Sequence, residues 1–445
     1  MSVSKYQTVF RGLAILALSA ILAFTGFVPK LAAEDPFLAA DIDWKQLEGT
    51  ELNVAMNKHP YTDAIEPYIP EFEELTGIDV VFDVLPEEAY WEKIRVLLAA
   101  GNPTPDIVWA GSLDIANFMN AGWLEPLDPY LDDPKLTDKD WYDFEDFIKG
   151  PIEAASLDGH VYALTMQSDA QMMAYRKDLF EAKGLKAPET FEELYEAAKA
   201  VHTDEVSGTC IRGLRGFTIT FQWTAFLLSN GGRFFDEDGN VVINSPEGVE
   251  VTEWYGQVMR ETGPEGLFQY GFPEVIAAFQ QGKCAISLDV AGVQAQFLLP
   301  EKSKVHDMVG FGIHPHGIDK VTTPMYWVWY LGMNPKSEHK GAAWLFLQWA
   351  TSKEILGRIP GSGTPGRASL WENPAYLDFY GPELSSAIQE SLTLVRPELV
   401  PYDHPKIFEM FDTIGQELQN IISEEKTAQQ GLDDAAAKIE EIISE

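Results

Sequence analysis

The sequence predicts an α/β protein made of two blocks that share strands. Strand-like and helical segments alternate along the chain, which is the pattern of parallel sheets covered by helices on both faces. The chain has 445 residues, and chains longer than about 250–300 residues usually divide into domains. No glycine-, proline- or serine-rich linker separates the two blocks. We therefore expect two lobes joined by crossing strands.

The first block contains three strands, each followed by a helix. We expect strands at residues 52–56, 78–85 and 106–110, and helices at residues 62–75, 87–100 and 112–122. Apolar residues in the second helix recur at helical spacing, at Tyr90, Ile94 and Leu97. Gly77 follows the first helix and suits the left-handed residue that ends it.

The second block begins near Tyr162 and contains more widely spaced elements. Thr190 and Glu193 form a capping box that opens a helix ending near Val201. Residues 234–242 predict a hairpin, and residues 284–288 and 326–333 predict strands. Ser337 is expected to cap a helix over residues 338–350, and residues 405–443 to form two amphipathic helices split near Gln430 and Gly431.

The composition indicates a globular protein with a strongly acidic surface. Hydrophobic residues make up 46% and charged residues 23% of the chain, and the formal net charge is −37. Such a surface repels phosphate backbones and anionic lipid headgroups. The charge therefore argues against nucleic-acid binding and against peripheral membrane binding, and a plain role in solubility accounts for it.

The amino terminus has the layout of a secretory signal peptide over residues 1–33. Lys5 and Arg11 precede an uncharged, mostly apolar stretch at residues 12–28, and small residues end at Ala33. We expect cleavage near Ala33 and a free periplasmic protein. A retained anchor is the alternative, because this stretch lies at the short limit of a membrane-spanning helix.

The two cysteines, Cys210 and Cys284, leave two interpretations open. An isolated pair in an exported protein forms a disulfide in many cases, but two separate buried thiols are equally compatible with the sequence. The chain has no CxxC motif and no zinc-ligand spacing. We therefore expect no metal and no cofactor.

Eleven short stretches, in this order, resemble the extracellular solute-binding proteins of carbohydrate ABC importers, the group that includes maltose-binding protein. Each stretch is loose by itself, but the ordered set spans nearly the whole predicted mature chain. The stretches are residues 72–80 (FEELTGIDV), 99–101 (AAG), 105–108 (PDIV), 122–127 (GWLEPL), 159–164 (GHVYAL), 175–180 (YRKDLF), 188–194 (PETFEEL), 230–232 (NGG), 244–248 (NSPEG), 278–283 (AFQQGK) and 342–347 (AAWLFL).

The resemblance implies a two-lobed periplasmic-binding-protein fold, each lobe a mainly parallel sheet flanked by helices. Lobe I would comprise residues 49–166 with 331–361, and lobe II residues 167–330 with 362–445. The chain would cross between them near residues 166–170, 328–332 and 361–365. It implies a monomer that closes on a sugar, oligosaccharide or polyol and then docks on inner-membrane permease subunits.

A sugar or polyol needs aromatic platforms for its C–H faces and polar side chains for its hydroxyls. Ligands of open parallel sheets lie beyond the carboxyl ends of strands. That rule, with the resemblance, selects these candidate ligand-binding residues: Asn57, His59, Tyr61, Ser112, Asp114, Gln167, Asp169, Gln222, Trp223, Asp289, Trp327, Trp329 and Arg367. Trp223→Ala and Asp289→Ala are each expected to weaken ligand binding by at least about tenfold without unfolding the protein.

Several of these residues have a plainer interpretation. Asp169 and Asp289 could cap helices or turns, and Arg367 could form a structural salt bridge. Most of the twelve tryptophans must be core residues, and those at helical spacing are expected there: Trp141, Trp254, Trp344 and Trp349. The GxGxxG match at residues 361–366 is interrupted by Pro365, so we interpret it as a loop.

Two other functions compete with solute capture for import of a carbohydrate. A secreted glycoside hydrolase would also combine carboxylates with aromatic rings, although the sequence has no GxSxG or other nucleophile motif. Capture of a non-carbohydrate solute such as a polyamine would suit the acidic chain. The resemblance favours a carbohydrate or polyol, and no catalytic residue is expected.

Overall fold

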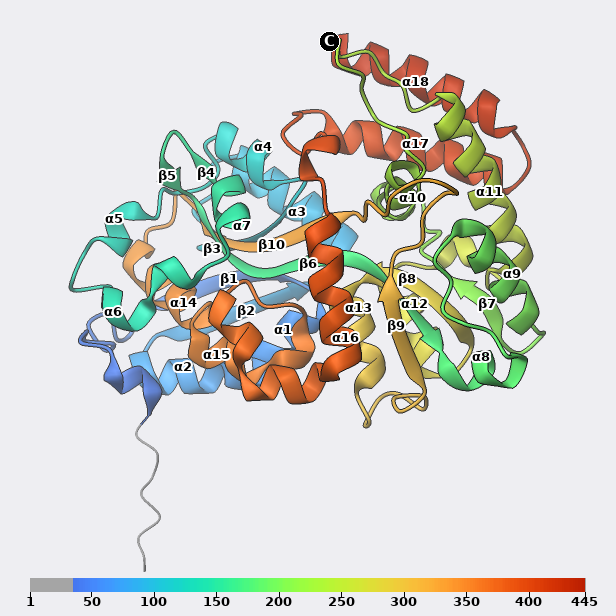
Figure 1. The fold of residues 1–445 in the computed structure, drawn as a ribbon. Helices are drawn as coiled ribbons and strands as arrows, with labels where there is room; N and C mark the ends of the chain where they lie inside the picture. The colour runs from blue at the N-terminus through green and yellow to red at the C-terminus, as the bar shows by residue number, and fades with distance from the viewer. Residues whose placement is uncertain (1–34, 445) are drawn as a thin grey trace, which may run out of the picture. The chain divides into compact units, whose positions relative to one another are not determined.

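The computed structural model describes residues 35–444, and the predicted signal peptide lies outside them. Residues 36–39 form a short 3-10 helix, η1 (Pro36–Ala39), and the chain from Ala40 onward forms a compact unit of its own. Within the described part of that unit, eight strands form one sheet in the order β2-β1-β3-β10-β6-β8-β7, with β9 paired to β6 (Figure 1). These strands are β1 (Glu51–Asn57), β2 (Asp79–Leu85), β3 (Ile107–Gly111), β6 (Ala163–Arg176), β7 (Ser207–Cys210), β8 (Cys284–Val290), β9 (Val309–Ile313) and β10 (Tyr326–Met333).

Parallel pairs occur at both ends of this sheet, and antiparallel pairs join them. Strand β1 runs parallel to β2 and β3, and β7 runs parallel to β8. Strand β10 is antiparallel to β3 and β6, and β6 is antiparallel to β8 and β9. The α/β class is therefore confirmed, and the antiparallel partners are the strands that link the two halves.

The fourteen residues of β6 connect the two halves of the sheet. Residues 163–170 pair with β10, and residues 171–176 pair with β8 and β9. All but Tyr175 are buried, as expected for a strand covered on both faces. Figure 1 shows β6 running from one half of the molecule into the other.

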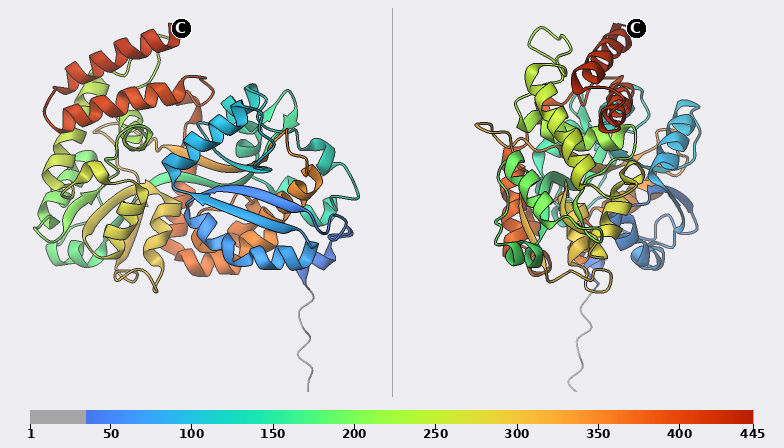
Figure 2. Two further views of the ribbon diagram at one scale, coloured as in Figure 1. Left: turned by 180° about the vertical axis from the view of Figure 1, so that it is seen from behind. Right: turned by 90° about the vertical axis from the view of Figure 1, so that its right-hand side faces the viewer.

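Helices cover both halves of the sheet, as the front view in Figure 1 and the rear view in Figure 2 show. The helices of eight or more residues are α2 (Ile69–Thr76), α3 (Glu87–Ala99), α9 (Phe191–Val201), α10 (Phe217–Ser229), α11 (Pro246–Thr262), α12 (Phe272–Gln280), α14 (Lys340–Ala350), α16 (Pro374–Leu394), α17 (Ile407–Ile422) and α18 (Ala428–Ser444). Shorter helices are α1 (Pro60–Ile65), α4 (Ile115–Asn120), α5 (Asp128–Leu131), α6 (Lys139–Tyr142), α7 (Lys149–Ala154), α8 (Lys177–Lys183), α13 (Ala291–Ala295) and α15 (Lys353–Arg358). Among residues 35–444, none of the helices has the length and apolarity to cross a membrane.

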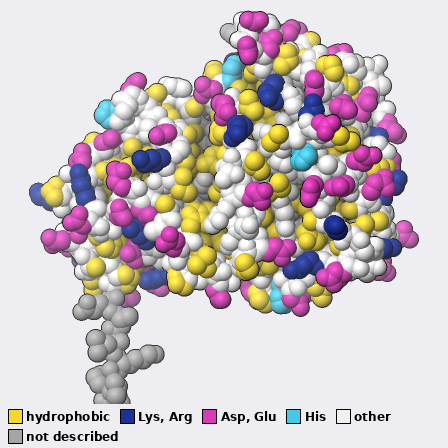
Figure 3. Space-filling model, in the orientation of Figure 1, with side chains coloured by type: hydrophobic (Ala, Val, Ile, Leu, Met, Phe, Trp, Pro, Cys, Tyr) yellow, Lys and Arg dark blue, Asp and Glu magenta, His cyan; other side chains and the backbone are white. Residues whose placement is uncertain are grey.

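Acidic side chains are spread over the molecular surface and outnumber basic ones on the face shown in Figure 3. Many basic side chains form ion pairs with acidic ones, such as Lys93 with Asp83 and Lys139 with Asp132. The surface charge is therefore diffuse, in keeping with the expected solubility role.

Several predicted elements are confirmed. Strand β10 begins and ends at the expected residues, the capping box of Thr190 and Glu193 opens α9, and Gly77 ends α2 with a φ of 70°. The expected helix over residues 62–75 is wrong, because Pro67 and Pro70 interrupt it. The chain there forms α1, a 3-10 turn and α2.

Three expectations in the second half differ from the structure. Helix α14 begins at Lys340 with His339 as its N-cap. The Ser337 hydroxyl donates to the buried Asp106 carboxylate at 2.5 Å and accepts from the His339 N–H at 3.0 Å, so it stabilises the turn before the helix. The tail helices separate at residues 423–427, and Gly431 lies inside α18. The hairpin turn expected over residues 234–242 forms, with an antiparallel bridge between Phe235 and Val241, but no strand of the described chain flanks it.

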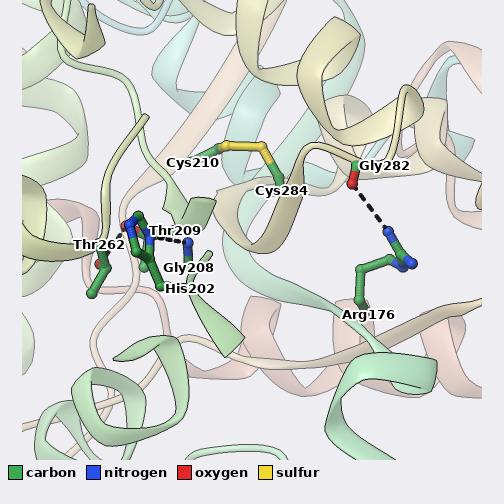
Figure 4. The surroundings of a disulfide bond; sticks show 8 residues. All are labelled: Arg176, His202, Gly208, Thr209, Cys210, Thr262, Gly282 and Cys284. Carbon is green, nitrogen blue, oxygen red and sulfur yellow. Dashed lines mark hydrogen bonds between the residues drawn. A yellow bond between two sulfur atoms is a disulfide. The ribbon is translucent and has the colours of Figure 1, made fainter. Parts of the chain in front are cut away.

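Cys210 and Cys284 form a disulfide between the parallel strands β7 and β8 (Figure 4). Their Cα atoms are 5.8 Å apart, and both side chains are fully buried. The bond closes a loop of 74 residues, a segment that contains α10, α11 and α12. The sequence alone did not distinguish this disulfide from two separate buried thiols.

Replacing both cysteines by serine is expected to lower the free energy of unfolding by about 4 kcal/mol, because the unfolded chain loses a long covalent loop. Chemical denaturation of the wild type and of the Cys210→Ser/Cys284→Ser variant measures this. Wild type unfolded in the presence of a reductant should resemble the variant. Equal midpoints for the oxidised wild type and the variant would contradict the expectation.

Candidate functional site

Side chains from both halves of the sheet line one small pocket, with a cavity volume of about 20 Å³. Most of the lining residues lie at or just after a strand end, begin a helix or lie on β10, and Phe221 and Val293 lie within α10 and α13. The lining residues are His59, Glu87, Arg212, Phe217, Phe221, Phe272, Val290, Val293, Trp327 and Trp329. The rule that ligands of α/β sheets lie beyond the carboxyl ends of strands therefore leads to this pocket.

Two indoles from β10 form the aromatic side of the pocket. Trp327 and Trp329 are two residues apart, so they project from the same face of the strand, and their ring centroids are 5.0 Å apart. Trp329 also stacks on Trp91 of α3 at 6.3 Å and 10°. Trp327 contacts Phe217 and Phe221 of α10 at 5.2 and 5.4 Å. The rings form one continuous apolar surface.

Gly111, the last residue of β3, makes room for both indoles. It pairs with Trp329 across the sheet. A Cβ atom at Gly111 would lie 2.6 Å from the Trp327 ring and 3.1 Å from the Trp329 ring. Such a distance forces a rigid ring to move, so this position determines where the indoles sit.

A buried ion pair lies beside the rings. Arg212 follows β7, and its guanidinium donates to Asp289 of β8 through Nε at 2.8 Å and through Nη2 at 2.5 Å. The exposed fractions of the two side chains are 7% and 0%. Phe221 and Phe272 flank the guanidinium at 5.2 and 5.5 Å. Because the pair is bidentate, the arginine charge is matched inside the protein.

His59 faces this pair from the end of β1, where it caps α1. Burial, together with the Arg212 charge, lowers the pKa of His59 to about 3. Its ring lies 5.3 Å from Trp329 and 6.0 Å from Phe272. The imidazole is therefore neutral at ordinary pH, with Nδ1 accepting from the Tyr61 backbone N–H at 3.2 Å.

Three of the predicted site residues, His59, Trp327 and Trp329, line the pocket, and Asp289 reaches it through Arg212. Two more, Asn57 and Gln222, are fully buried immediately beside lining segments. Among the described residues, the side-chain amides of Asn57 and Gln222 have no hydrogen-bond partner. Buried polar groups are paired in most native proteins, so these two amides are candidates for ligand contact.

Gln167 and Asp169 hold the crossing segments together. The Gln167 amide donates to the Ser362 carbonyl, and Asp169 accepts from the Thr364 hydroxyl at 2.6 Å. Gly292 lies close by, since a Cβ there would be 3.1 Å from the Asp169 carboxylate. Burial raises the pKa of Asp169 to about 6, above its ordinary value of 3.8. Both residues therefore join β6 to residues 362–364 and lie outside the pocket lining.

Tyr61, Ser112 and Asp114 lie outside the lining because each serves the fold. The Tyr61 hydroxyl donates to the Ala350 carbonyl at 2.9 Å, and the Ser112 hydroxyl accepts from the Val328 N–H at 2.7 Å. Asp114 is paired with Arg95 at 3.0 Å. Burial raises the pKa of Asp114 to about 6 even with Arg95 beside it.

Trp223 and Arg367 are also removed from the candidate site. Trp223 is fully buried, and its indole N–H donates to Thr252 at 2.9 Å. Arg367 is fully buried against Phe147, 4.0 Å from the ring centroid, and donates to the Thr351 carbonyl at 2.6 Å. The plainer interpretation of Arg367 as a structural residue fits these contacts.

Sequence reasoning missed Glu87, Arg212, Phe217, Phe221 and Phe272. The strand-end rule would have selected Arg212 if the four-residue strand β7 had been recognised. Glu87 directly follows β2 but was assigned to the helix it begins. The three phenylalanines begin helices or lie on one, where an apolar residue is ordinarily a core residue.

Removing the carboxylate of Asp289 is expected to destabilise the protein, because Arg212 would remain buried without a counterion. Asp289→Asn should lower the free energy of unfolding by about 3–5 kcal/mol, measured by urea denaturation. The buried pair argues against the expectation that Asp289→Ala leaves the protein folded. Asp132→Asn, which breaks an exposed pair with Lys139, is the matched control and should change little. Equal losses in both variants would contradict the prediction.

Asp169 is expected to make stability depend on pH between about 4 and 7. A pKa raised from 3.8 to about 6 means that the folded state binds the proton more tightly than the unfolded state. This contribution to stability is therefore present at about pH 4 and falls by about 3 kcal/mol as the pH rises through about 6. Asp169→Asn should lack that fall, while contributions shared by both proteins cancel in the difference. Parallel stability–pH curves for the two proteins would refute the assignment.

Comparison with known proteins identifies the family. Residues 58–355, more than half of the chain, match the family model described as bacterial extracellular solute-binding protein. The chain is 28% identical to an erythritol/L-threitol-binding protein of Mycolicibacterium smegmatis over 349 residues, covering 74% of this chain and 73% of that protein. It is also 28% identical to a mannitol-binding protein of Pseudomonas aeruginosa over 376 residues, covering 80% and 83%.

A solved structure supports the same conclusion. An ABC-transporter solute-binding protein of Agrobacterium vitis with bound D-mannitol matches with a TM-score of 0.82 at 28% identity, covering 89% of this chain and 98% of that one. The expected two-lobed α/β fold is thereby confirmed. With the family match over residues 58–355, it follows that this chain belongs to the bacterial extracellular solute-binding proteins.

Proposed function

We propose that this chain is the substrate-binding component of an ABC importer and that it captures a small, neutral polyol or sugar. The observation that carries the proposal is the pocket between Trp327, Trp329 and the Arg212–Asp289 pair, which is lined from both halves of the sheet. Closure of the two lobes around the ligand would present both lobes to inner-membrane permease subunits. Only a ligand with higher affinity for the closed state can drive that change.

The chemistry of the lining favours a polyhydroxylated ligand. Indole and phenyl rings offer faces for C–H groups, each contact contributing about 0.5–1.5 kcal/mol beyond area burial. The Trp327 indole nitrogen and the amides of Asn57 and Gln222 have no hydrogen-bond partner among residues 35–444, and hydroxyl groups can supply one. Several such contacts together reach the roughly −8 kcal/mol of a micromolar site.

Charge narrows the ligand class. Since Arg212 is matched by Asp289 and His59 is neutral at ordinary pH, no unmatched positive charge favours a phosphate. The relatives named for erythritol, threitol and mannitol support the same class.

Other parts of the expected role are included in the proposal. Lobe I comprises residues 49–166 with 331–361, and lobe II residues 167–330 with 362–445. The protein is exported by its amino-terminal signal, cleaved near Ala33, and acts as a free periplasmic monomer. It performs no reaction on its ligand, so a bound saccharide should be recovered unchanged.

The test is a thermal-shift screen followed by calorimetry, with erythritol, ribitol, D-mannitol, glucose, maltotriose, spermidine and glycerol 3-phosphate as probes. A short polyol or monosaccharide at a hundred times its Kd should add about 2.7 kcal/mol of stability. Gly111→Ala should weaken its binding about tenfold, because the added methyl displaces the Trp327 ring. Gly150→Ala is the matched control, since a Cβ there meets nothing within 4 Å. No shift with any neutral probe, or a shift with spermidine alone, would overturn the proposal.

A further inference from the structure

One contact joins the two halves of the molecule outside the pocket lining. Arg95 lies on α3, which packs on β1, and its guanidinium carbon is 3.7 Å from the ring centroid of Phe408. Phe408 lies on α17, which packs on α10, α11 and α18. At this distance the planar cation lies against the ring in a cation–π contact.

Arg95 is held firmly on its own side. Its Nη2 donates to Asp114 Oδ1 at 3.0 Å, and the second oxygen of that carboxylate accepts from the Gly111 N–H at 3.4 Å. Asp114 is almost fully buried, with 1% of its side chain exposed. Asp114 of the same lobe therefore orients Arg95. Phe408 contacts the oriented guanidinium from the other lobe.

Stacked rings connect this contact to the pocket. The Arg95 guanidinium lies 5.7 Å from the Trp91 ring centroid, and Trp91 stacks on Trp329, which lines the pocket. Phe408, Arg95, Trp91 and Trp329 thus form one series of stacked planar groups. Packed interiors transmit displacements of this kind, because they have little free volume.

We infer that Arg95 is a positioning residue whose contact with Phe408 links the aromatic side of the pocket to lobe closure. This inference rests on the proposed function, since it assigns the pair a part in capturing the ligand. The contact joins a residue of one lobe to a residue of the other, and neither Arg95 nor Phe408 lines the pocket. It therefore stabilises the closed form whichever ligand is bound. Its loss should lower every affinity by the same factor, because the population of the binding-competent state falls.

The test compares Phe408→Leu, which keeps an apolar side chain, with Phe408→Tyr, which keeps the aromatic face. Phe408→Leu should raise the Kd of D-mannitol, ribitol and erythritol about 3- to 30-fold by a common factor, mainly through faster dissociation. Phe408→Tyr should retain wild-type affinity. Lys199→Met removes a cation–π contact with Tyr195 inside α9 and should leave every Kd unchanged. Arg95→Lys and Phe408→Leu should each weaken binding alone. In the double variant the loss of affinity should be smaller than the sum of the two single losses, because both variants remove the same contact.

Three results with bound ligand would overturn the inference. They are an unchanged Kd in Phe408→Leu, a loss of affinity that differs between the polyols, and a similar loss of affinity in Phe408→Tyr. If no polyol or sugar binds even the wild type, the proposed function fails, and the contact is then tested without ligand. Spin labels at Lys135→Cys and Lys302→Cys would report the distance between the lobes, and Phe408→Leu should lower the closed fraction. Equal distance distributions in the two ligand-free proteins would then refute the inference.

Discussion

The pairing of β6 with partners in both halves of the sheet is the constraint on which the rest of the structure depends. Its residues 163–170 pair with β10, and residues 171–176 pair with β8 and β9. Neither half therefore has a complete sheet without β6. The register with β10 shifts between Trp329 and Tyr330, and such irregularities bend a strand and redirect its side chains. The pocket therefore lies near the point where β6 changes its pairing from β10 to β8 and β9.

The groups beside the pocket are fixed by the protein before any ligand arrives. Asp289 orients Arg212, and the fully buried Gln294 donates to the carbonyls of Met172 and Asp289 at 2.6 and 3.1 Å. A ligand that meets rigid partners loses little free energy to side-chain ordering. The remaining cost of binding is then the movement of the lobes, which is why a contact such as Arg95 with Phe408 affects affinity without touching the ligand.

The sequence was sufficient for the fold and for part of the site. Strand β10 and the capping box of α9 were predicted at their observed residues, because alternation and capping are local signals. His59, which follows β1, and the two β10 indoles were selected from the sequence and line the pocket. Arg212 was missed because the four-residue strand β7 carries little periodicity. Trp223 was misassigned because an indole in a helix has the same local pattern whether it faces a ligand or Thr252.

The difference between these successes and failures is physical. A strand end specifies where the backbone places a residue, but the partner of its side chain depends on residues far away in the sequence. Asp289 lies 77 residues from Arg212, and Ser112 lies 216 residues from Val328. A carboxylate at a strand end therefore looks the same in the sequence whether it binds a hydroxyl of a ligand or a guanidinium of the protein. In this chain the guanidinium of Arg212 takes it.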